Sequence, residues 1–148
     1  MSKAAASTTT HLIRLLVPAG KAAPTPPVGP ALGQRGIKSM DFCKSFNART
    51  AHYLPGVPLP TKIRVQPDKS YDYRVTAPQA AYLLMQAAGI TQGAKNPGSE
   101  VVATLSLKHI YEIAKIKQAD PAFEHQPLRK VASSILGQAK SMGIEVTY

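Results

Sequence analysis

The sequence predicts an α+β fold in two parts: a three-stranded sheet with one helix, followed by a domain of three helices. Segments before residue 75 alternate or run apolar as β-strands do, and segments after Pro78 repeat apolar residues at helical spacing. A chain of 148 residues has room for two small domains. We therefore expect a flexible tail over residues 1–8, an α+β domain over residues 9–74 and a three-helix domain over residues 75–148.

The strands of the first domain are predicted by apolar and alternating patterns. His11 to Val17 is apolar and β-branched enough for a strand, which Pro18 and Gly20 end. In residues 61–65 and 71–75 apolar side chains alternate with charged ones, and residues 67–70 between them are typical of a turn. These two segments predict a hairpin.

A proline-rich loop and a helix connect the first strand to the hairpin. Residues 24–36 read PTPPVGPALGQRG, and we expect the four prolines and three glycines to prevent regular helix there and to hold the loop near polyproline geometry. Helical character returns over residues 37–49, where Met40, Cys43 and Phe46 recur at threefold spacing.

Three helices are predicted in the second domain. The first covers Gln79 to Ala88 and ends at Gly89. Ser106 is the expected N-cap of the second, whose buried stripe is predicted to hold Leu107, Ile110, Tyr111 and Ala114. The third begins near Pro127, and its predicted buried stripe is Leu128, Val131, Ile135, Ala139 and Met142.

The charge of the chain favours a nucleic-acid partner. Eighteen Lys and Arg stand against eight Asp and Glu, a formal net charge of +10. An anionic membrane is the weaker alternative, because no run of 18 apolar residues is present. Residues 1–74 hold eleven cations against three acids and residues 75–148 hold seven against five, so binding by the second domain must depend on shape more than on charge.

Catalysis and cofactor binding are not indicated. The single cysteine, Cys43, cannot form an internal disulfide and is typical of a small buried residue, and no cysteine spacing fits zinc. The glycine-rich loop lacks the Gly-Lys-Ser/Thr succession of a nucleotide-binding loop. The chain has four histidines: His11, His52, His109 and His125. None of them has a carboxylate or a nucleophilic residue at a spacing that would indicate a catalytic site. We expect no enzyme activity, cofactor or metal.

The third helix carries a second face of small and polar residues: Lys130, Ser134, Gly137, Gln138 and Ser141. A glycine within a helix costs about 1 kcal/mol relative to Ala, so Gly137 indicates that something approaches the backbone closely. One hypothesis is an RNA surface, with Lys130, Lys140 and Gln138 contacting phosphates or base edges. The alternative is close packing against another helix.

Three short helices ending in a recognition helix are also typical of helix-turn-helix and homeodomain proteins. A DNA-binding regulator is therefore the alternative function. Such proteins usually dimerise and read bases with Arg, Asn or Gln, whereas this face is small and the sequence has no evident dimer seam.

Several runs resemble the ribosomal protein L-eleven family. They are AGKAAPTPPVGPALGQRG at residues 19–36, MDFCKSFNA at residues 40–48, APQAAYLL at residues 77–84, AAGI at residues 87–90 and GQAKSMG at residues 137–143. The resemblance covers nearly the whole chain.

This resemblance implies an α+β domain that faces elongation and release factors and a homeodomain-like domain that binds the GTPase-associated region of large-subunit rRNA. The implied partners are this rRNA, stalk-base ribosomal proteins and, transiently, the factors, with no membrane and no homo-oligomer. The rRNA contacts assigned by resemblance and by the helix face are Gly93, Lys95, Pro97, Gly98, Lys130, Ser134, Gly137, Gln138, Lys140, Ser141 and Met142. The residues expected to face factors or thiopeptide antibiotics are Pro24, Pro26, Pro27, Gly29, Pro30, Gly33 and Gln34.

Departures from the family pattern bear on rRNA contact and on location. The usual double proline at the start of the first C-terminal helix is Pro78-Gln79 here, and residues 95–100 are less basic than usual. Residues 121–127 differ from bacterial members, and the start is rich in Ala, Ser and Thr with no acid before Asp41. A disordered tail before a basic domain explains this start equally well. We expect the mitochondrial ribosome in the matrix, with the bacterial cytoplasm as the alternative.

Overall fold

The structure is a computed structural model that describes residues 10–147, so the predicted tail over residues 1–8 lies outside the described residues. The chain divides into two compact units, Met1–Thr76 and Ala77–Tyr148, called here the N-terminal and C-terminal units. Each has its own cluster of buried apolar side chains.

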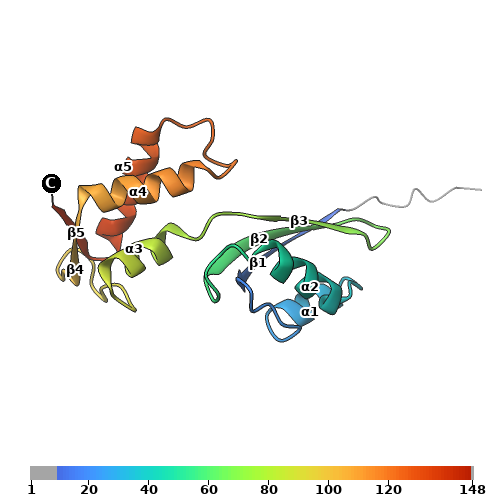
Figure 1. Ribbon diagram of the computed structural model, residues 1–148. Helices are drawn as coiled ribbons and strands as arrows, with labels where there is room; N and C mark the ends of the chain where they lie inside the picture. The colour runs from blue at the N-terminus through green and yellow to red at the C-terminus, as the bar shows by residue number, and fades with distance from the viewer. Residues whose placement is uncertain (1–9, 148) are drawn as a thin grey trace, which may run out of the picture. The chain divides into compact units, whose positions relative to one another are not determined.

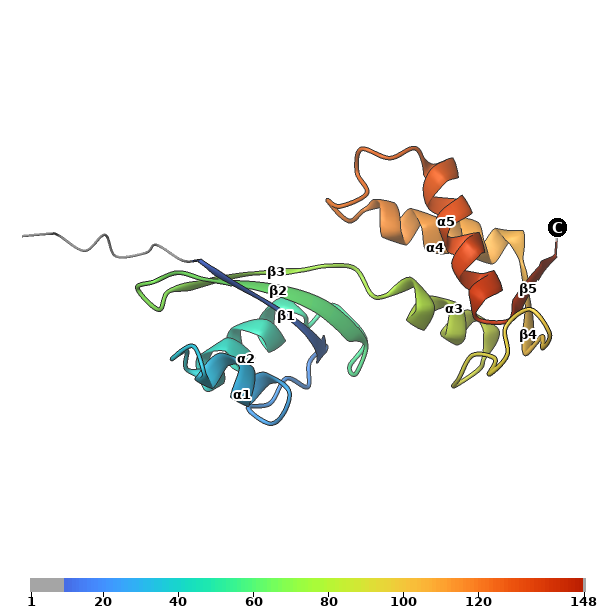
Figure 2. The same cartoon turned by 180° about the vertical axis from the view of Figure 1, so that it is seen from behind.

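The N-terminal unit is a three-stranded antiparallel sheet with two helices on one side (Figures 1 and 2). The strands are β1 (His11–Pro18), β2 (Pro58–Val65) and β3 (Tyr71–Val75), in the order β1-β2-β3. The helices are α1 (Val28–Gly33) and α2 (Ser39–Arg49). The predicted α+β class and the three-stranded sheet are confirmed.

The core of this unit forms where α2 packs on the sheet. Phe42 and Phe46 are fully buried, and the Phe42 ring meets the Tyr73 ring edge-on at a centroid distance of 5.3 Å. Cys43 is buried in α2, as expected. Met40, however, is 56% exposed, so the threefold spacing of Met40, Cys43 and Phe46 does not follow the buried side of the helix. Phe42, which the threefold spacing passed over, is buried instead.

The prediction that the proline-rich loop holds no helix was also wrong, because α1 occupies Val28–Gly33. Pro30 is the third residue of α1, where a backbone N–H has no intrahelical acceptor, so its missing donor costs nothing. Pro27, with φ −90° and ψ −4°, is the N-cap rather than part of a polyproline segment. Val28 and Leu32 anchor the helix in the core.

The C-terminal unit contains the three expected helices: α3 (Ala80–Ala88), α4 (Leu107–Gln118) and α5 (Leu128–Ser141). It also contains a parallel pair of strands that the sequence did not predict, β4 (Ala103–Ser106) and β5 (Ile144–Thr147). The unit is therefore not built from helices alone. Each strand has only four residues, too few for alternation to be recognised.

The buried stripe of α4 differs from the predicted one. Ser106 caps the helix as expected, with its Oγ accepting from the backbone N–H of Lys108 at 3.4 Å. Leu107 and Tyr111, however, are 40% and 47% exposed, and Ile113 is buried instead. Two stripes on this helix are apolar enough to be the core stripe, and α3 and α5 cover only the one that contains Ile113.

Candidate nucleic-acid interface

Helix α5 presents a continuous polar face to solvent. Its buried side holds Val131, Ile135 and Ala139, as predicted. The exposed residues Lys130, Ser134, Gly137, Gln138 and Ser141 are called here the α5 outer face. Apart from the neighbours Gly137 and Gln138 they follow at spacings of three or four, so they lie on one side of the helix. The sequence grouping of these five residues is thus reproduced in space.

Gly137 lies in open space at the centre of the α5 outer face. A Cβ atom built at this residue meets nothing within 4 Å. The alternative that Gly137 allows close packing against another helix is therefore wrong within residues 10–147. Gly137 would allow another surface to approach the helix backbone closely, but no part of the described chain does so.

The loop over residues 91–100 lies against the C-terminal end of α5, although about forty residues separate them in sequence. The backbone N–H of Ala94 donates to the carbonyl of Met142 at 2.9 Å, and that of Val102 donates to the carbonyl of Gly143 at 2.9 Å. The structure thus brings predicted residues of the loop beside those of α5. In the loop, Lys95, Pro97 and Gly98 are exposed and Gly93 is half-buried.

Gly143 makes this junction possible. Its φ of +74° belongs to the left-handed region, where residues with a Cβ are strained. An added Cβ would collide with the Cβ of Ala94 and would lie 2.8 Å from the carbonyl oxygen of Glu100. Only glycine lets the chain turn from α5 into β5 with the loop this close.

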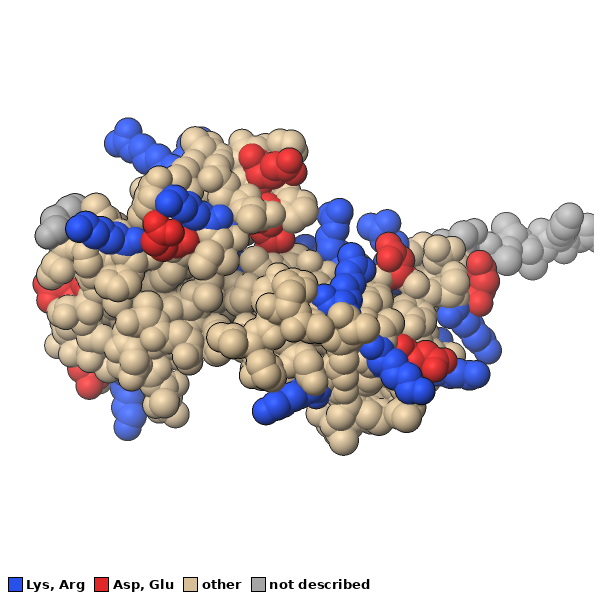
Figure 3. All heavy atoms as spheres, in the orientation of Figure 1, with Lys and Arg blue, Asp and Glu red and all other residues tan. Residues whose placement is uncertain are grey.

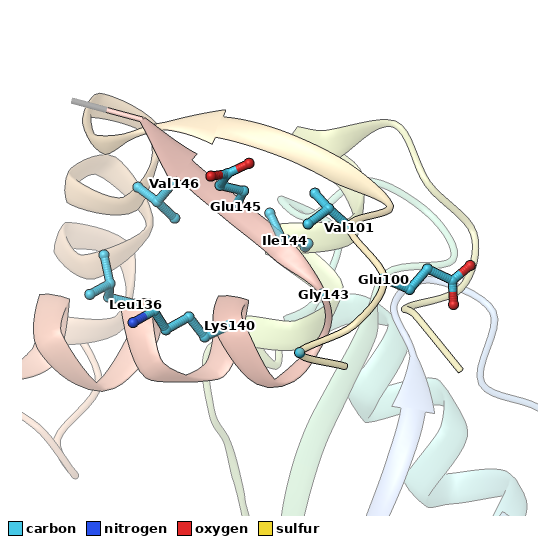
Figure 4. A pocket seen from close by; sticks show the side chains of 9 residues that line it. Glu100, Val101, Leu136, Lys140, Gly143, Ile144, Glu145 and Val146 are labelled. Carbon is cyan, nitrogen blue, oxygen red and sulfur yellow. The ribbon is translucent and has the colours of Figure 1, made fainter. Parts of the chain in front are cut away.

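A cavity of about 360 Å³ borders one side of α5. Figure 4 shows Leu136 and Lys140 on the helix facing Ile144 and Val146 of β5 across this space. Two acids, Glu100 and Glu145, also line it. Sequence reasoning did not find this cavity, because β5 was not predicted. The two carboxylates make the space between α5 and β5 less favourable for a phosphate than the α5 outer face, and Lys140, which lines this space, is also exposed to solvent.

A second hollow, of about 410 Å³, borders the other side of α5. Ser134 and Gln138 line it from α5, Ala80 and Ala81 line it from the first turn of α3, and Lys117 and Phe123 complete it. Gln79, the N-cap residue of α3, lines it as well. Residues of the α5 outer face therefore share a hollow with the start of α3.

A buried polar group fixes the start of the C-terminal unit beside this hollow. The backbone N–H of Ala77 donates to Asp120 Oδ2 at 3.1 Å, and Lys117 Nζ donates to the Ala77 carbonyl at 3.3 Å. Lys117 Nζ lies 4.0 Å from Asp120 Oδ2. Burial lowers the pKa of Lys117, and the charge of Asp120 opposes that shift. These contacts hold the chain leading into α3 against the end of α4.

The residues predicted to face factors or antibiotics all lie in the N-terminal unit, in α1 or the segment before it, except for Gln34, which directly follows α1. Gly29 is half-buried, and a Cβ there would collide with the carbonyl oxygen of Pro24, so the turn before α1 requires glycine. The other six are exposed: Pro24, Pro26, Pro27, Pro30, Gly33 and Gln34. This segment presents a compact turn and helix start rather than an extended chain.

Three further features of the described residues concern metal binding, the histidines and membrane-spanning helices. Within residues 10–147, no group of three or more His, Cys, Asp or Glu side chains could hold a metal ion. All four histidines are exposed. No described helix has both the length and the apolar character needed to cross a membrane.

Comparisons with known proteins cover almost the whole chain. The family model described as "Ribosomal protein L11, N-terminal domain" matches residues 13–71, and that described as "Ribosomal protein L11, RNA binding domain" matches residues 76–146. "Large ribosomal subunit protein uL11m" of Schizosaccharomyces pombe is 49% identical over 141 residues, which is 95% of this chain and 98% of the relative.

Two further relatives widen the range of organisms. The uL11m protein of Caenorhabditis elegans is 46% identical, covering 93% of this chain and 70% of the relative. "Large ribosomal subunit protein uL11" of the bacterium Roseobacter denitrificans is 49% identical, covering 90% of this chain and 94% of the relative. The chain therefore belongs to the ribosomal protein L11 family.

Proposed function

We propose that this chain is a structural constituent of the large ribosomal subunit and binds the GTPase-associated region of large-subunit rRNA through its C-terminal unit. The observation that carries the proposal is the α5 outer face, where Gly137 lies in open space at the centre of an exposed polar surface. A small, flat helix face suits close approach to a folded ribose-phosphate surface. The helices α3, α4 and α5 are proposed to act as a homeodomain-like module, with α5 as the recognition helix.

The proposed rRNA contacts come from both segments that the junction at Gly143 holds together. We propose that Lys95 and Lys140, both exposed, contact phosphates and that Gln138 contacts a base edge or a ribose hydroxyl. The remaining contacts are backbone or small side chains: Gly93, Pro97, Gly98, Ser134, Gly137, Ser141 and Met142, with Lys130 at the far end of the face. The protein has a binding role, with no catalytic step and no cofactor.

We propose the mitochondrial matrix as the location. Relatives from fungus, nematode and fly carry the name uL11m, the mitochondrial form of this ribosomal protein. Bacterial uL11 relatives are about equally identical. A bacterial ribosome in the cytoplasm is accordingly the alternative location, and the role in the large subunit is the same in both.

Separating the two units tests which of them binds the rRNA. Residues 75–148 alone are expected to bind the GTPase-associated rRNA fragment, and residues 1–74 alone to bind it weakly although they carry most of the charge. Starting at residue 75 keeps the amide of Ala77 internal, so its bond to Asp120 is retained. The measurement is a filter-binding or fluorescence titration of both fragments at near-physiological salt. Tighter binding by residues 1–74 would reverse the assignment.

The segment Pro24–Gln34 is proposed to face translation factors and thiopeptide antibiotics, with stalk-base proteins as neighbours. The double variant Pro24→Ser with Pro27→Ser is expected to leave assembly into the subunit intact but to lower factor-dependent GTP hydrolysis and thiopeptide binding. The reason is that Pro27 occupies the N-cap position of α1 and the backbone of Pro24 lies close to Gly29, so the fixed φ of both prolines limits the conformations of this surface. Pro67→Ser, in the turn between β2 and β3, is the control.

Subunit incorporation, factor-stimulated hydrolysis and thiopeptide binding are measured on the same particles. Loss of incorporation would make the segment an anchor, and unchanged hydrolysis together with unchanged drug binding would make it a linker. Either result contradicts a factor-facing role.

A further inference from the structure

The side of the N-terminal sheet away from the helices is exposed and basic. Alternation along the strands sends one set of side chains toward α1 and α2 and the other set outward. The second set, called here the outer sheet face, comprises Leu12, Arg14, Leu16, Lys62, Arg64, Asp72 and Arg74, all of which are exposed. Figures 1 and 2 show both helices on the other side of the sheet, and Figure 3 shows Lys and Arg side chains projecting along the sheet side of this unit.

Three cations form one row across the outer sheet face. The register pairs Arg14 of β1 with Lys62 of β2, and Lys62 with Arg74 of β3. Side chains directly opposite each other on neighbouring strands have Cβ atoms about 5 Å apart, and like charges there are destabilising. Among residues 10–147, the ion pairs within 4.0 Å both lie in the C-terminal unit. No carboxylate of the described chain therefore lies within 4.0 Å of the row, although Asp72 stands on the same face opposite Arg64.

The apolar residues on this face indicate which kind of polyanion the row would meet. Leu12 and Leu16 are 51% and 43% exposed and flank Arg14 along the edge strand β1. The aromatic side chains of the sheet, Tyr71 and Tyr73, belong to the opposite face and pack against Phe42. Single-stranded RNA binds sheets by stacking its bases on aromatic side chains, and this face has none. Cations interleaved with leucines complement a protein surface that carries both carboxylates and apolar side chains.

We propose that the outer sheet face docks an acidic protein surface in which carboxylates alternate with apolar side chains. This rests on the proposed function, in which the C-terminal unit holds the rRNA and the N-terminal unit is free to meet proteins. A second copy of this chain is a poor occupant, because the row would face an equally basic row. The carboxylates of the partner would lie along Arg14, Lys62 and Arg74, and its apolar side chains would cover Leu12 and Leu16.

The test uses the full chain and the variant Lys62→Glu, with Lys44→Glu as the matched control. Lys62 is the centre of the row, whereas Lys44 is an exposed residue of α2, on the helical side of the same unit. The probes are a synthetic peptide of alternating Glu and Leu, a peptide of alternating Glu and Ser with the same charge, and poly-uridine RNA. Affinities are measured by titration at two salt concentrations.

The wild-type chain is expected to bind the Glu-Leu peptide more tightly than the Glu-Ser peptide and than poly-uridine. Lys62→Glu is expected to weaken Glu-Leu binding at least about tenfold, and Lys44→Glu to change it less than about twofold. Equal affinity for the two peptides, or equal losses in the two variants, would overturn the proposal in favour of unspecific attraction. Preference for poly-uridine that depends on Lys62 would overturn it in favour of an RNA-binding face.

Two further readouts exclude loss of folding and separate this proposal from the rRNA-binding function. Lys62→Glu places a carboxylate between two arginines, so the Tm of the N-terminal unit should stay the same or rise by a few degrees. A fall in Tm would mean that Arg14, Lys62 and Arg74 do not repel one another, and it would overturn the proposal. Both variants should bind the rRNA fragment as the wild type does. If the wild type binds the peptide but not the rRNA, the proposed function fails and the docking surface stands.

Discussion

Replacing Gly143 with Ala is expected to destabilise the C-terminal unit by about 3 kcal/mol, the combined cost of left-handed backbone strain and of a steric collision. The backbone at residue 143 has φ +74°, and the new Cβ would collide with Ala94 and the carbonyl of Glu100. The carbonyls of Met142 and Gly143 bind Ala94 of the loop over residues 91–100 and Val102 just after that loop. Separation of this segment from α5 should therefore also weaken rRNA binding.

Gly89→Ala is the matched control for this variant. Gly89 ends α3 with φ +66°, but a Cβ there meets nothing within 4 Å. It should therefore cost only the backbone strain, about 1 kcal/mol. Urea unfolding, with amide hydrogen exchange read at α5, measures the stability of the C-terminal unit in both variants. Equal losses of stability in the two variants would show that the steric collision with Ala94 and Glu100 contributes nothing.

Local patterns in the sequence were sufficient to predict the elements that have one buried side and one exposed side. The hairpin of β2 and β3 was predicted because Ile63 and Val65 alternate with Lys62 and Arg64. The buried stripe of α5 was predicted because its apolar spacing continues over four turns. In both cases the pattern repeats often enough within one element to identify the buried side.

Contacts between distant segments could not be predicted in this way. The pairing of β4 with β5 joins residues about forty positions apart, and neither strand is long enough to show a pattern. The same holds for the bond between Ala94 and Met142, which joins the loop to α5. On α4 the periodicity allowed two stripes, and only the packing of α3 and α5 decides that Ile113 rather than Tyr111 is buried.

Helix α1 was missed for a different reason. Proline opposes a helix only beyond its first turn, because the backbone N–H groups of the first turn have no intrahelical acceptor. Pro27 and Pro30 occupy the N-cap and third positions of α1, where they are tolerated. The residues predicted to face factors thus lie on a short helix, in the turn before it and at its C-cap.

The substitution Gly137→Leu tests the rRNA interface directly. The variant should fold with a slightly more stable α5, because Leu favours helix more than glycine by about 1 kcal/mol. Its side chain would extend into the space in front of the α5 outer face, where nothing in the described chain lies within 4 Å of a Cβ. We expect rRNA binding to weaken by more than about 1 kcal/mol, which is a loss of affinity of about fivefold or more, because close approach is lost. Gly137→Ala, with a much smaller side chain, should keep most of the affinity.

The most direct measurement is sedimentation of the tagged full-length chain through sucrose gradients of mitochondrial and cytosolic lysates, with Gly137→Leu and Gly137→Ala run in parallel. The wild type and Gly137→Ala are expected to comigrate with large ribosomal subunits from mitochondria, and Gly137→Leu is expected to shift toward the top of the gradient while remaining folded. A wild-type chain that stays at the top, or a Gly137→Leu variant that comigrates as fully as the wild type, would contradict the proposal that the C-terminal unit holds this protein on large-subunit rRNA through α5.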